Sequence, residues 1–219
     1  MDRRSFLLPL PAWLLSACGP SAPPPPAAKA VTAINLLESP HAGSWRQAGI
    51  PDEGPVAVKD GVLTLAEGQP MTGAVFAAWD SLGLPASGYS IHYEAMRVEG
   101  EDFFGTVTFP VSGRNSHASF VLGGWGGTVT GISSIDFSDA NENQTRSEQR
   151  FTNGRWYRLR LEVRPEELRA WVDDRLVVNV SIKGRTVGLR PGFIDHCRPF
   201  GFASYGSAAR IRGLVVQGL

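Results

Sequence analysis

The chain has 219 residues and carries 21 Lys and Arg against 21 Asp and Glu, so its formal net charge is zero. A balanced charge without a long basic run gives no electrostatic attraction to nucleic acid, and we expect no nucleic-acid partner. After the first 17 residues, the sequence has no apolar run of about 20 residues, the length that a membrane-spanning helix needs.

Residues 1–17 have the features of a bacterial export signal. Arg3 and Arg4 supply a positive start, a short apolar stretch follows, and residues 15–18 have the sequence Leu-Ser-Ala-Cys. That sequence matches the lipobox of bacterial lipoproteins, in which the cysteine thiol takes a diacylglycerol. We therefore predict a lipoprotein signal peptide and lipidation at Cys18, with cleavage beside an incidental cysteine as the alternative. The arginine pair also resembles a twin-arginine signal, so the export route stays open.

Residues 18–33 follow as a proline-rich tether. They include four consecutive prolines, which favour an extended polyproline II spacer. If Cys18 carries lipid, Cys197 lacks a partner for an intramolecular disulfide and is expected to be an inert thiol, and residues 34–219 must be stabilised by their core alone. That length is ample for one self-sufficient domain. We expect a monomer of the cell envelope, outside the cytoplasm and attached to a membrane only through its lipid.

From residue 34 onward, alternating apolar and polar residues between turn signals predict strands. Asp60-Gly61 between two apolar runs is typical of a two-residue hairpin. Residues 156–163 alternate strictly, which predicts that Leu159 faces a core and Arg158 faces solvent. A short helical turn is expected near residues 165–168. The other strands are predicted over residues 89–98, 102–110, 117–125, 168–172, 177–182, 201–205 and 211–217.

Many short strands, 25 glycines and little helix predict an all-β fold, a two-sheet antiparallel β-sandwich of the jelly-roll type. Three strands combine an apolar face with a mixed face of aromatic, hydroxyl and titratable side chains. These mixed faces include His92 and Glu94, then Phe104 and Thr106, then His117, Ser119 and Trp125. Aromatic rings can stack on the C–H faces of sugars while polar groups bind their hydroxyls. The pattern favours a saccharide-binding groove over an ordinary solvated face.

Several short motifs follow one another along residues 34–219. They are Asp60-Gly61-Val62-Leu63, Met71-Thr72-Gly73, Asp102-Phe103-Phe104, Thr108-Phe109-Pro110-Val111, Gly123-Gly124-Trp125-Gly126-Gly127, Asp139-Ala140-Asn141-Glu142-Asn143, Trp156-Tyr157-Arg158 and Ile211-Arg212-Gly213-Leu214. Together they resemble the 3-keto-disaccharide hydrolase domain family of the concanavalin A-like lectin/glucanase superfamily. The resemblance implies a concanavalin A-like jelly roll with a concave face for saccharides. It carries over no catalytic residue, and the superfamily includes lectins without activity.

The chemistry of a 3-keto sugar, which has an acidified proton at C2, suggests roles for the titratable residues. Glu94 is the predicted general base, and His92 or His117 is the predicted acid or oxyanion stabiliser. The alternative for Glu94 is an ion pair with Arg97 or with a base on a neighbouring strand. Trp125 lies among four glycines and is predicted to be a sugar platform, with a core plug as the alternative.

A polar loop over residues 136–146 supplies two more predicted substrate-binding residues, Asn141 and Glu142, which join Phe104 and Trp125. Its oxygen-rich side chains would suit Ca²⁺, but the Asp-x-Asp-x-Asp-Gly spacing is missing, so a hydrogen-bonded rim is favoured. We expect no cofactor, with Ca²⁺ as the one that stays open. Asp195, His196 and Cys197 are too few for a zinc site.

Three functions remain in view. The first is a hydrolase or lyase that acts on 3-keto-glycosides or similar sugars, and the second is a non-catalytic carbohydrate-binding lipoprotein. A structural module of the envelope is the third. The motifs of serine hydrolases, P-loop proteins, Rossmann folds and zincins are missing from the sequence. A second acidic residue near Glu94 would favour glycosidase chemistry, whereas an aromatic groove without a buried titratable group would favour a lectin.

Overall fold

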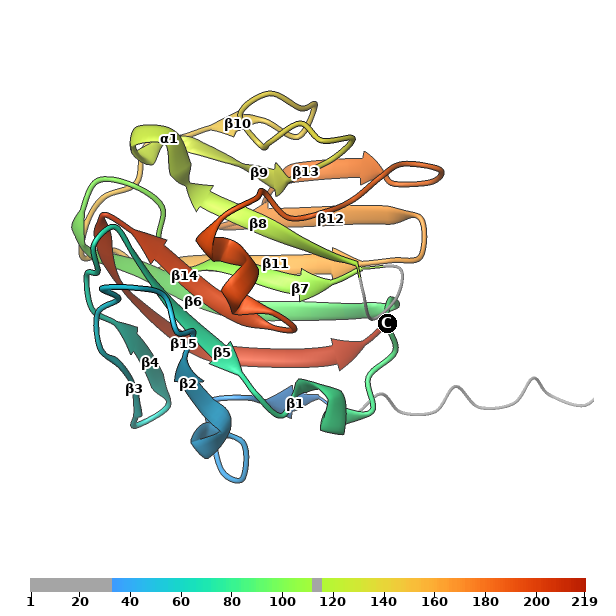
Figure 1. Ribbon diagram of the computed structural model, residues 1–219. Helices are drawn as coiled ribbons and strands as arrows, with labels where there is room; N and C mark the ends of the chain where they lie inside the picture. The colour runs from blue at the N-terminus through green and yellow to red at the C-terminus, as the bar shows by residue number, and fades with distance from the viewer. Residues whose placement is uncertain (1–32, 112–115) are drawn as a thin grey trace, which may run out of the picture. The chain divides into compact units, whose positions relative to one another are not determined.

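The computed structural model describes residues 33–111 and 116–219 (Figure 1). The predicted signal peptide, Cys18 and all but the last residue of the predicted tether lie outside the described residues. Within the described ranges, no helix is both long enough and apolar enough to cross a membrane.

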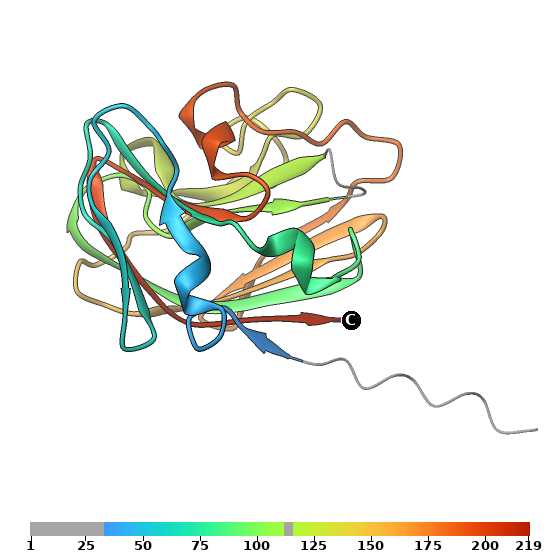
Figure 2. The ribbon, with the colours of Figure 1, turned by 60° about the horizontal axis from the view of Figure 1, so that its bottom comes forward.

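Two antiparallel sheets form the domain, which confirms the predicted β-sandwich (Figures 1 and 2). Sheet A has the order β13 (Arg175–Ser181), β12 (Glu167–Val172), β11 (Tyr157–Val163), β6 (Tyr89–Gly100), β15 (Ser207–Gly218), β4 (Val62–Leu65) and β3 (Val56–Lys59), with β1 (Ile34–Asn35) paired to β15. Sheet B has the order β10 (Ser147–Glu148), β9 (Val129–Ser133), β8 (His117–Gly123), β7 (Thr106–Pro110), β14 (Gly201–Tyr205), β5 (Met71–Phe76) and β2 (Trp45–Gln47). The helical segments are short: η1 (Ala42–Ser44), η2 (Trp79–Leu82), α1 (Gly124–Gly127) and η3 (Phe193–Cys197).

The core lies between the two sheets and is rich in aromatic rings. Trp79 stacks on Phe200 with ring centroids 4.4 Å apart. Two buried tyrosines of β6 reach across the core. The Tyr89 hydroxyl donates to the carbonyl of Pro110 in β7 (2.6 Å), and the Tyr93 hydroxyl donates to the carbonyl of Gly105, which directly precedes β7 (3.0 Å). These bonds satisfy polar groups that would otherwise be costly to bury, and they join sheet A to sheet B.

Local sequence signals predict most strands, with differences where glycines change the backbone direction. The Asp60-Gly61 hairpin joins β3 to β4, and the φ angles of 51° and 73° at its two central residues fit the expected type I′ turn. β7 begins only at Thr106, because Gly105 has a φ of 55° and interrupts the alternation predicted from residue 102. The helical turn expected over residues 165–168 is wrong, since β12 already begins within it.

A long connection, residues 185–198, crosses the outer face of sheet B, and we call it the strap (Figures 1 and 2). Its beginning is fixed by Val187, which bridges to Ile135, and by Gly188, whose N–H donates to the Ser134 carbonyl at 3.1 Å. Its end is η3, which packs on β5 and β14 and buries Cys197 completely. Burial raises the pKa of the Cys197 thiol to about 12, so the thiol stays protonated at neutral pH.

Candidate functional site

The structure separates the predicted site residues onto two opposite outer faces. On β6, Tyr93 and its alternate neighbours are buried in the core, so His92 and Glu94 lie on the outer face of sheet A. On β8, Phe120 lies in the core, so His117 lies on the outer face of sheet B. The prediction that Glu94, His92, His117 and Trp125 share one groove is therefore wrong. Alternation shows which residues of a strand share a face, but not which sheet the strand joins.

Glu94 is held in an ion pair on the outer face of sheet A. Arg212, opposite it on β15, donates from Nε to Glu94 Oε2 at 2.7 Å, and the Arg212 guanidinium lies 4.2 Å from the centroid of the Trp156 ring. This partner is the neighbouring-strand base that the sequence left as the alternative. The surrounding depression, of about 330 Å³, is open and mostly polar, and it is also lined by Arg155, Arg158 and Asp173.

His92 lies one pleat away from Glu94 on the same face. Its Nε2 is 3.2 Å from Ser90 Oγ, and Arg160 is opposite it on β11. Partial burial and the charge of Arg160 lower the pKa of His92, although Glu162 opposes the shift. The imidazole is therefore neutral at neutral pH.

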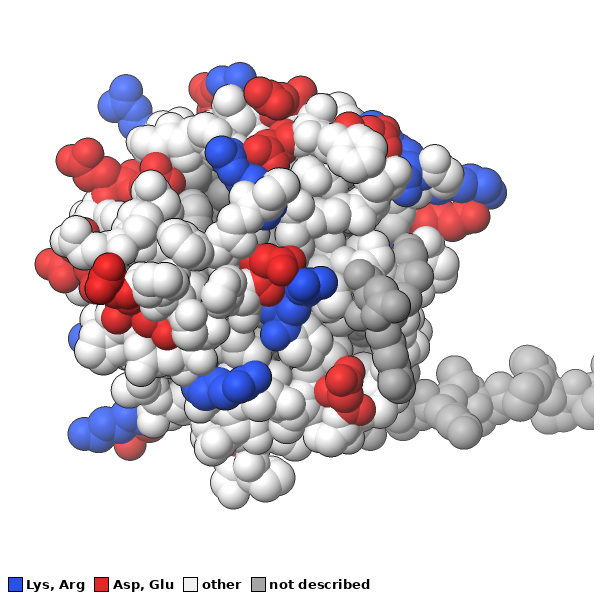
Figure 3. Space-filling model, in the orientation of Figure 1, with Lys and Arg blue, Asp and Glu red and all other residues white. Residues whose placement is uncertain are grey.

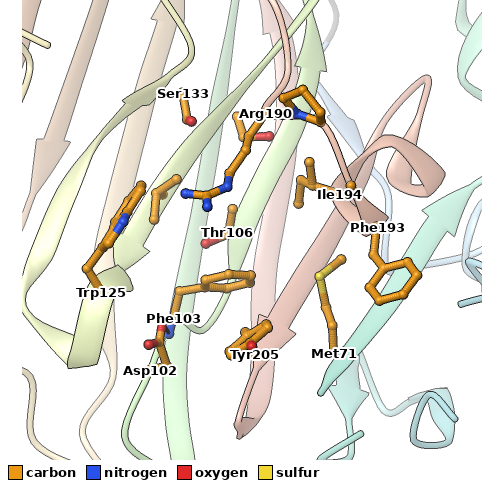
Figure 4. Close-up of a pocket in the computed structure, with 14 residues that line it drawn as sticks. Met71, Asp102, Phe103, Thr106, Trp125, Ser133, Arg190, Phe193, Ile194 and Tyr205 are labelled. Atoms are coloured by element: carbon orange, nitrogen blue, oxygen red, sulfur yellow. Dashed lines mark hydrogen bonds between the residues drawn. The ribbon is translucent and has the colours of Figure 1, made fainter. Parts of the chain in front are cut away.

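A pocket of about 280 Å³ opens on the outer face of sheet B, between the strap and α1 (Figure 4). Its walls are aromatic and come from distant parts of the chain, with Trp125 on one side and Phe103, Tyr205 and Phe193 on the other (Figure 4). The remaining lining residues are Met71, Asp102, Thr106, Ser119, Val121, Ser133, Arg190, Pro191, Gly192 and Ile194.

The aromatic walls expose their rings to the pocket and to solvent. Trp125 is 37% exposed, and Tyr205 and Phe193 are each 40% exposed. The Phe103 and Tyr205 rings pack against each other, with centroids 5.6 Å apart at a tilt of 38°. Large exposed aromatic side chains gathered at one cavity are unusual on a protein surface and indicate a binding site.

The buried floor of the pocket combines hydroxyl side chains with the apolar Met71 and Val121. The side chains of Thr106, Ser119 and Ser133 line it, and none of these residues is more than 3% exposed. Ser119 Oγ is 3.0 Å from Thr108 Oγ1 on the neighbouring strand, and Ser133 Oγ donates to Asp139 Oδ1 at 2.9 Å. Hydroxyl groups can donate and accept at once, so each can take a further hydrogen bond from a ligand.

Arg190 extends from the strap into the pocket, between Trp125 and the floor (Figure 4). Its Nη1 donates to Asp139 Oδ2 at 2.9 Å, and its guanidinium carbon lies 5.7 Å from the centroid of the Trp125 ring. Around the pocket, the space-filling view shows acidic and basic side chains scattered over the face without a broad area of one sign (Figure 3). Such a face suits an uncharged, polar ligand better than a polyanion.

Phe104 is not a pocket residue, which corrects its predicted role in substrate binding. It is fully buried, and its ring lies edge-on to Phe151 with centroids 5.2 Å apart. The left-handed backbone of Gly105 breaks the predicted alternation, so Phe103 lines the pocket in its place. His117 is buried on the outer face of sheet B but does not line the pocket.

The loop over residues 136–146 is fixed by its own hydrogen bonds. The buried Asn143 amide donates to the carbonyls of Ile132 (2.8 Å) and Ser138 (3.0 Å). Asn141 and Glu142 lie on this loop outside the pocket lining.

Two carboxylates of the same loop are paired with arginines. Asp136 and Asp139 pair with Arg185 and Arg190, and the hydrogen bond from Arg185 lowers the pKa of Asp136. A cation bound by these two carboxylates would have to compete with both arginines for their oxygens. Within the described residues, no three His, Cys, Asp or Glu side chains gather as a metal site would need.

Sequence reasoning identified Trp125 but missed the residues opposite it. Tyr205 ends a predicted strand, and Phe193 and Arg190 belong to the strap, for which no periodic pattern exists in the sequence. The one local signal is an aromatic residue in a glycine- and proline-containing segment, Pro191-Gly192-Phe193.

No protein-family model and no curated protein matches the sequence. Solved structures do match. The carbohydrate-binding module CBM66 from Bacillus subtilis is 12% identical with a TM-score of 0.51, covering 80% of this chain and 96% of that chain. The Crh5 transglycosylase is 8% identical with a TM-score of 0.55, covering 86% and 83%. A sialidase is 9% identical with a TM-score of 0.52, covering 86% of this chain and 18% of its own. At these identities the likeness shows a β-sandwich fold that binding modules and enzymes share.

Proposed function

We propose that the chain is a non-catalytic carbohydrate-binding lipoprotein whose pocket on sheet B holds a saccharide against Trp125. The observation that carries the proposal is the pair of exposed aromatic walls, Trp125 and Phe103–Tyr205, over a floor of buried hydroxyl groups. Sugars present apolar C–H faces and hydroxyl edges, and this pocket offers a partner for each. The fold supports the proposal, since two of its structural neighbours are named as a carbohydrate-binding module and a transglycosylase.

Binding is favoured over hydrolysis because the pocket lacks the groups that hydrolysis needs. Glycosidases use two carboxyl groups on opposite sides of the scissile bond. Among the described lining residues, Asp102 is the one carboxylate, and both of its oxygens accept backbone N–H groups. The titratable residues that line the pocket, Asp102, Arg190 and Tyr205, are not buried. An aromatic site without a buried titratable group is what the lectin hypothesis requires.

A 3-keto-glycoside hydrolase or lyase is the second candidate, and it would use the other face of the molecule. Glu94 there shares its depression with Trp156, an aromatic ring that could contact a sugar, and neutral His92 is one pleat away. Glu94 would remove the C2 proton while His92 stabilises the developing charge. The ion pair between Glu94 and Arg212 would first have to open, because the Arg212 guanidinium binds the Glu94 carboxylate and lies against the Trp156 ring.

Trp125→Ala is expected to weaken saccharide binding by about 1–3 kcal/mol, because it removes a large aromatic contact area from the pocket wall. A glycan array would identify a ligand, and isothermal titration would give the affinities. Trp156→Ala is the matched control, since it removes the same ring from the opposite face. If Trp156→Ala weakens binding and Trp125→Ala does not, the ligand occupies the Glu94 face. In that case Glu94→Gln should lower turnover of a 3-keto-glycoside by about 10²–10⁴-fold.

Attachment to the membrane is a separate part of the proposal, and it depends on Cys18. Cys18→Ala should leave an unlipidated precursor, because the thiol that takes the diacylglycerol is gone. Detergent-phase partitioning measures this directly: the wild-type chain should enter the detergent phase and the variant should not. Equal partitioning of the two proteins would contradict the lipoprotein assignment and, with it, the location in the cell envelope.

A further inference from the structure

The carboxylate of Asp102 joins the two aromatic walls of the pocket. Its Oδ1 accepts the backbone N–H of the next residue, Phe103, at 2.7 Å, and its Oδ2 accepts the backbone N–H of Gly126 at 2.9 Å. Phe103 belongs to one wall, whereas Gly126 follows Trp125 in the other. One side chain therefore holds backbone groups that are distant in the sequence and lie on opposite sides of the pocket.

The α1 turn that carries Trp125 needs such an attachment. Trp125 itself has a φ of 50° and Gly126 a φ of 82°, and both lie in the left-handed region. For a residue with a side chain this backbone is strained. A hydrogen bond to a charged carboxylate is stronger than one between neutral groups, so the bond from Gly126 to Asp102 offsets that strain.

The turn also lies directly on the backbone beside Asp102. At Gly127, which has a φ of 95°, an added Cβ would be 2.2 Å from the Glu101 carbonyl oxygen. That spacing leaves no room for a side chain, so only glycine permits the approach. The α1 turn and the segment that contains Asp102 are thus packed backbone to backbone.

Side chains of sheet A hold the backbone of Asp102 by hydrogen bonds. The Asp102 carbonyl accepts hydrogen bonds from Arg97 Nη1 (3.2 Å) and from Ser207 Oγ (3.1 Å), and its N–H lies 3.1 Å from the same Ser207 oxygen. Arg97 is itself only 6% exposed, and its Nη2 donates to the Phe151 carbonyl at 2.8 Å. The backbone of Asp102 is therefore anchored to strands β6 and β15 of sheet A.

We infer that Asp102 is a positioning residue that fixes the Trp125 ring relative to Phe103 and so sets the width of the pocket. The inference rests on the proposed function only for the nature of the ligand. Both carboxylate oxygens accept backbone N–H groups of the two aromatic walls, and through these bonds Asp102 acts on the position of the walls. Preorganised walls raise affinity because the ligand does not have to order them.

The test is ¹⁹F NMR of the mature lipidated protein in detergent, labelled with 5-fluorotryptophan, in which Trp125→Phe assigns the Trp125 resonance; of the six tryptophans in the sequence, Trp13 leaves with the predicted signal peptide. Asp102→Ala should shift and broaden that resonance and leave the other tryptophan signals in place. Asp102→Asn should give a smaller change, because its amide oxygen can still accept one of the two bonds. Glu101→Gln is the matched control. Glu101 is exposed, and its hydrogen bonds with Gly206 and Arg97 are made by its backbone N–H and carbonyl.

Affinity for a glycan that the wild-type protein binds should fall roughly tenfold in Asp102→Ala, because both hydrogen bonds from the carboxylate to the walls are lost. A Trp125 resonance that stays unchanged in Asp102→Ala overturns the inference, even if affinity falls, since Asp102 would then contact the ligand itself. A resonance that moves in a protein whose wild type binds no glycan sustains the positioning role and overturns the proposed function. If Asp102→Ala does not fold, Asp102→Asn decides by the same criteria.

Discussion

Phe104→Ala is expected to lower the free energy of unfolding by about 3–5 kcal/mol, the range for removing a buried aromatic side chain. Phe104 is fully buried, its ring contacts those of Phe151 and Tyr157, and the guanidinium carbon of Arg97 lies 5.4 Å from its centroid. Alanine would leave a cavity that these large neighbours cannot fill without moving. Urea denaturation followed by circular dichroism measures the change.

The adjacent Phe103→Ala provides the control because the two residues are chemically identical and lie on opposite sides of sheet B. Phe103 is only partly buried, so its replacement should cost about 1 kcal/mol of stability. It should instead weaken saccharide binding, since it removes half of the Phe103–Tyr205 wall. A larger stability loss for Phe103→Ala than for Phe104→Ala would mean that the faces of this segment are assigned the wrong way round.

Leu159→Ala should destabilise the domain by about 2–5 kcal/mol through the cavity it leaves. Leu159 is 3% exposed and belongs to the central core between the sheets. Its strand, β11, pairs with β6 on one side and β12 on the other, so the surrounding backbone is held on both edges and cannot collapse into the space. Thermal and urea unfolding should both show the loss.

Arg158→Ala is the matched control on the same strand. The Arg158 side chain is 63% exposed, and its ion pair with Asp174 joins two solvent-exposed groups. Exposed pairs contribute about 0–1 kcal/mol, so this substitution should be nearly silent. Similar losses for Leu159→Ala and Arg158→Ala would contradict the inward and outward faces of β11 that both the alternation and the structure give.

The fold was accessible from the sequence because its signals are local. Strict alternation placed Leu159 in the core, and Asp60-Gly61 identified its hairpin without any tertiary information. The membership of strands in sheets was not accessible, because it depends on pairing between residues far apart in the sequence. That is why Glu94 and Trp125 could each be placed on a mixed face and still lie on opposite sides of the molecule.

The candidate site was only partly predictable for a related reason. Trp125 was identified because its flanking glycines leave it without neighbours that could cover it, and the structure places it in the pocket wall. Phe104 was misassigned because the φ of 55° at Gly105 is a tertiary outcome: glycine permits that value but does not require it. The strap has no periodic pattern, so the sequence did not predict that Arg190 and Phe193 would line the pocket.

The composition of the pocket wall has a thermodynamic consequence for finding the ligand. Its residues run from Met71 to Tyr205 and come from five inner strands of sheet B, from α1 and from the strap, so the cavity exists only in the complete native fold. A sugar that binds there binds the native state and not the unfolded chain. Such linkage stabilises a protein by about 2.7 kcal/mol at a ligand concentration one hundred times its dissociation constant. The melting temperature of the intact protein should therefore rise with any sugar that binds in the pocket, and the loss of that rise in Trp125→Ala would assign it to this site.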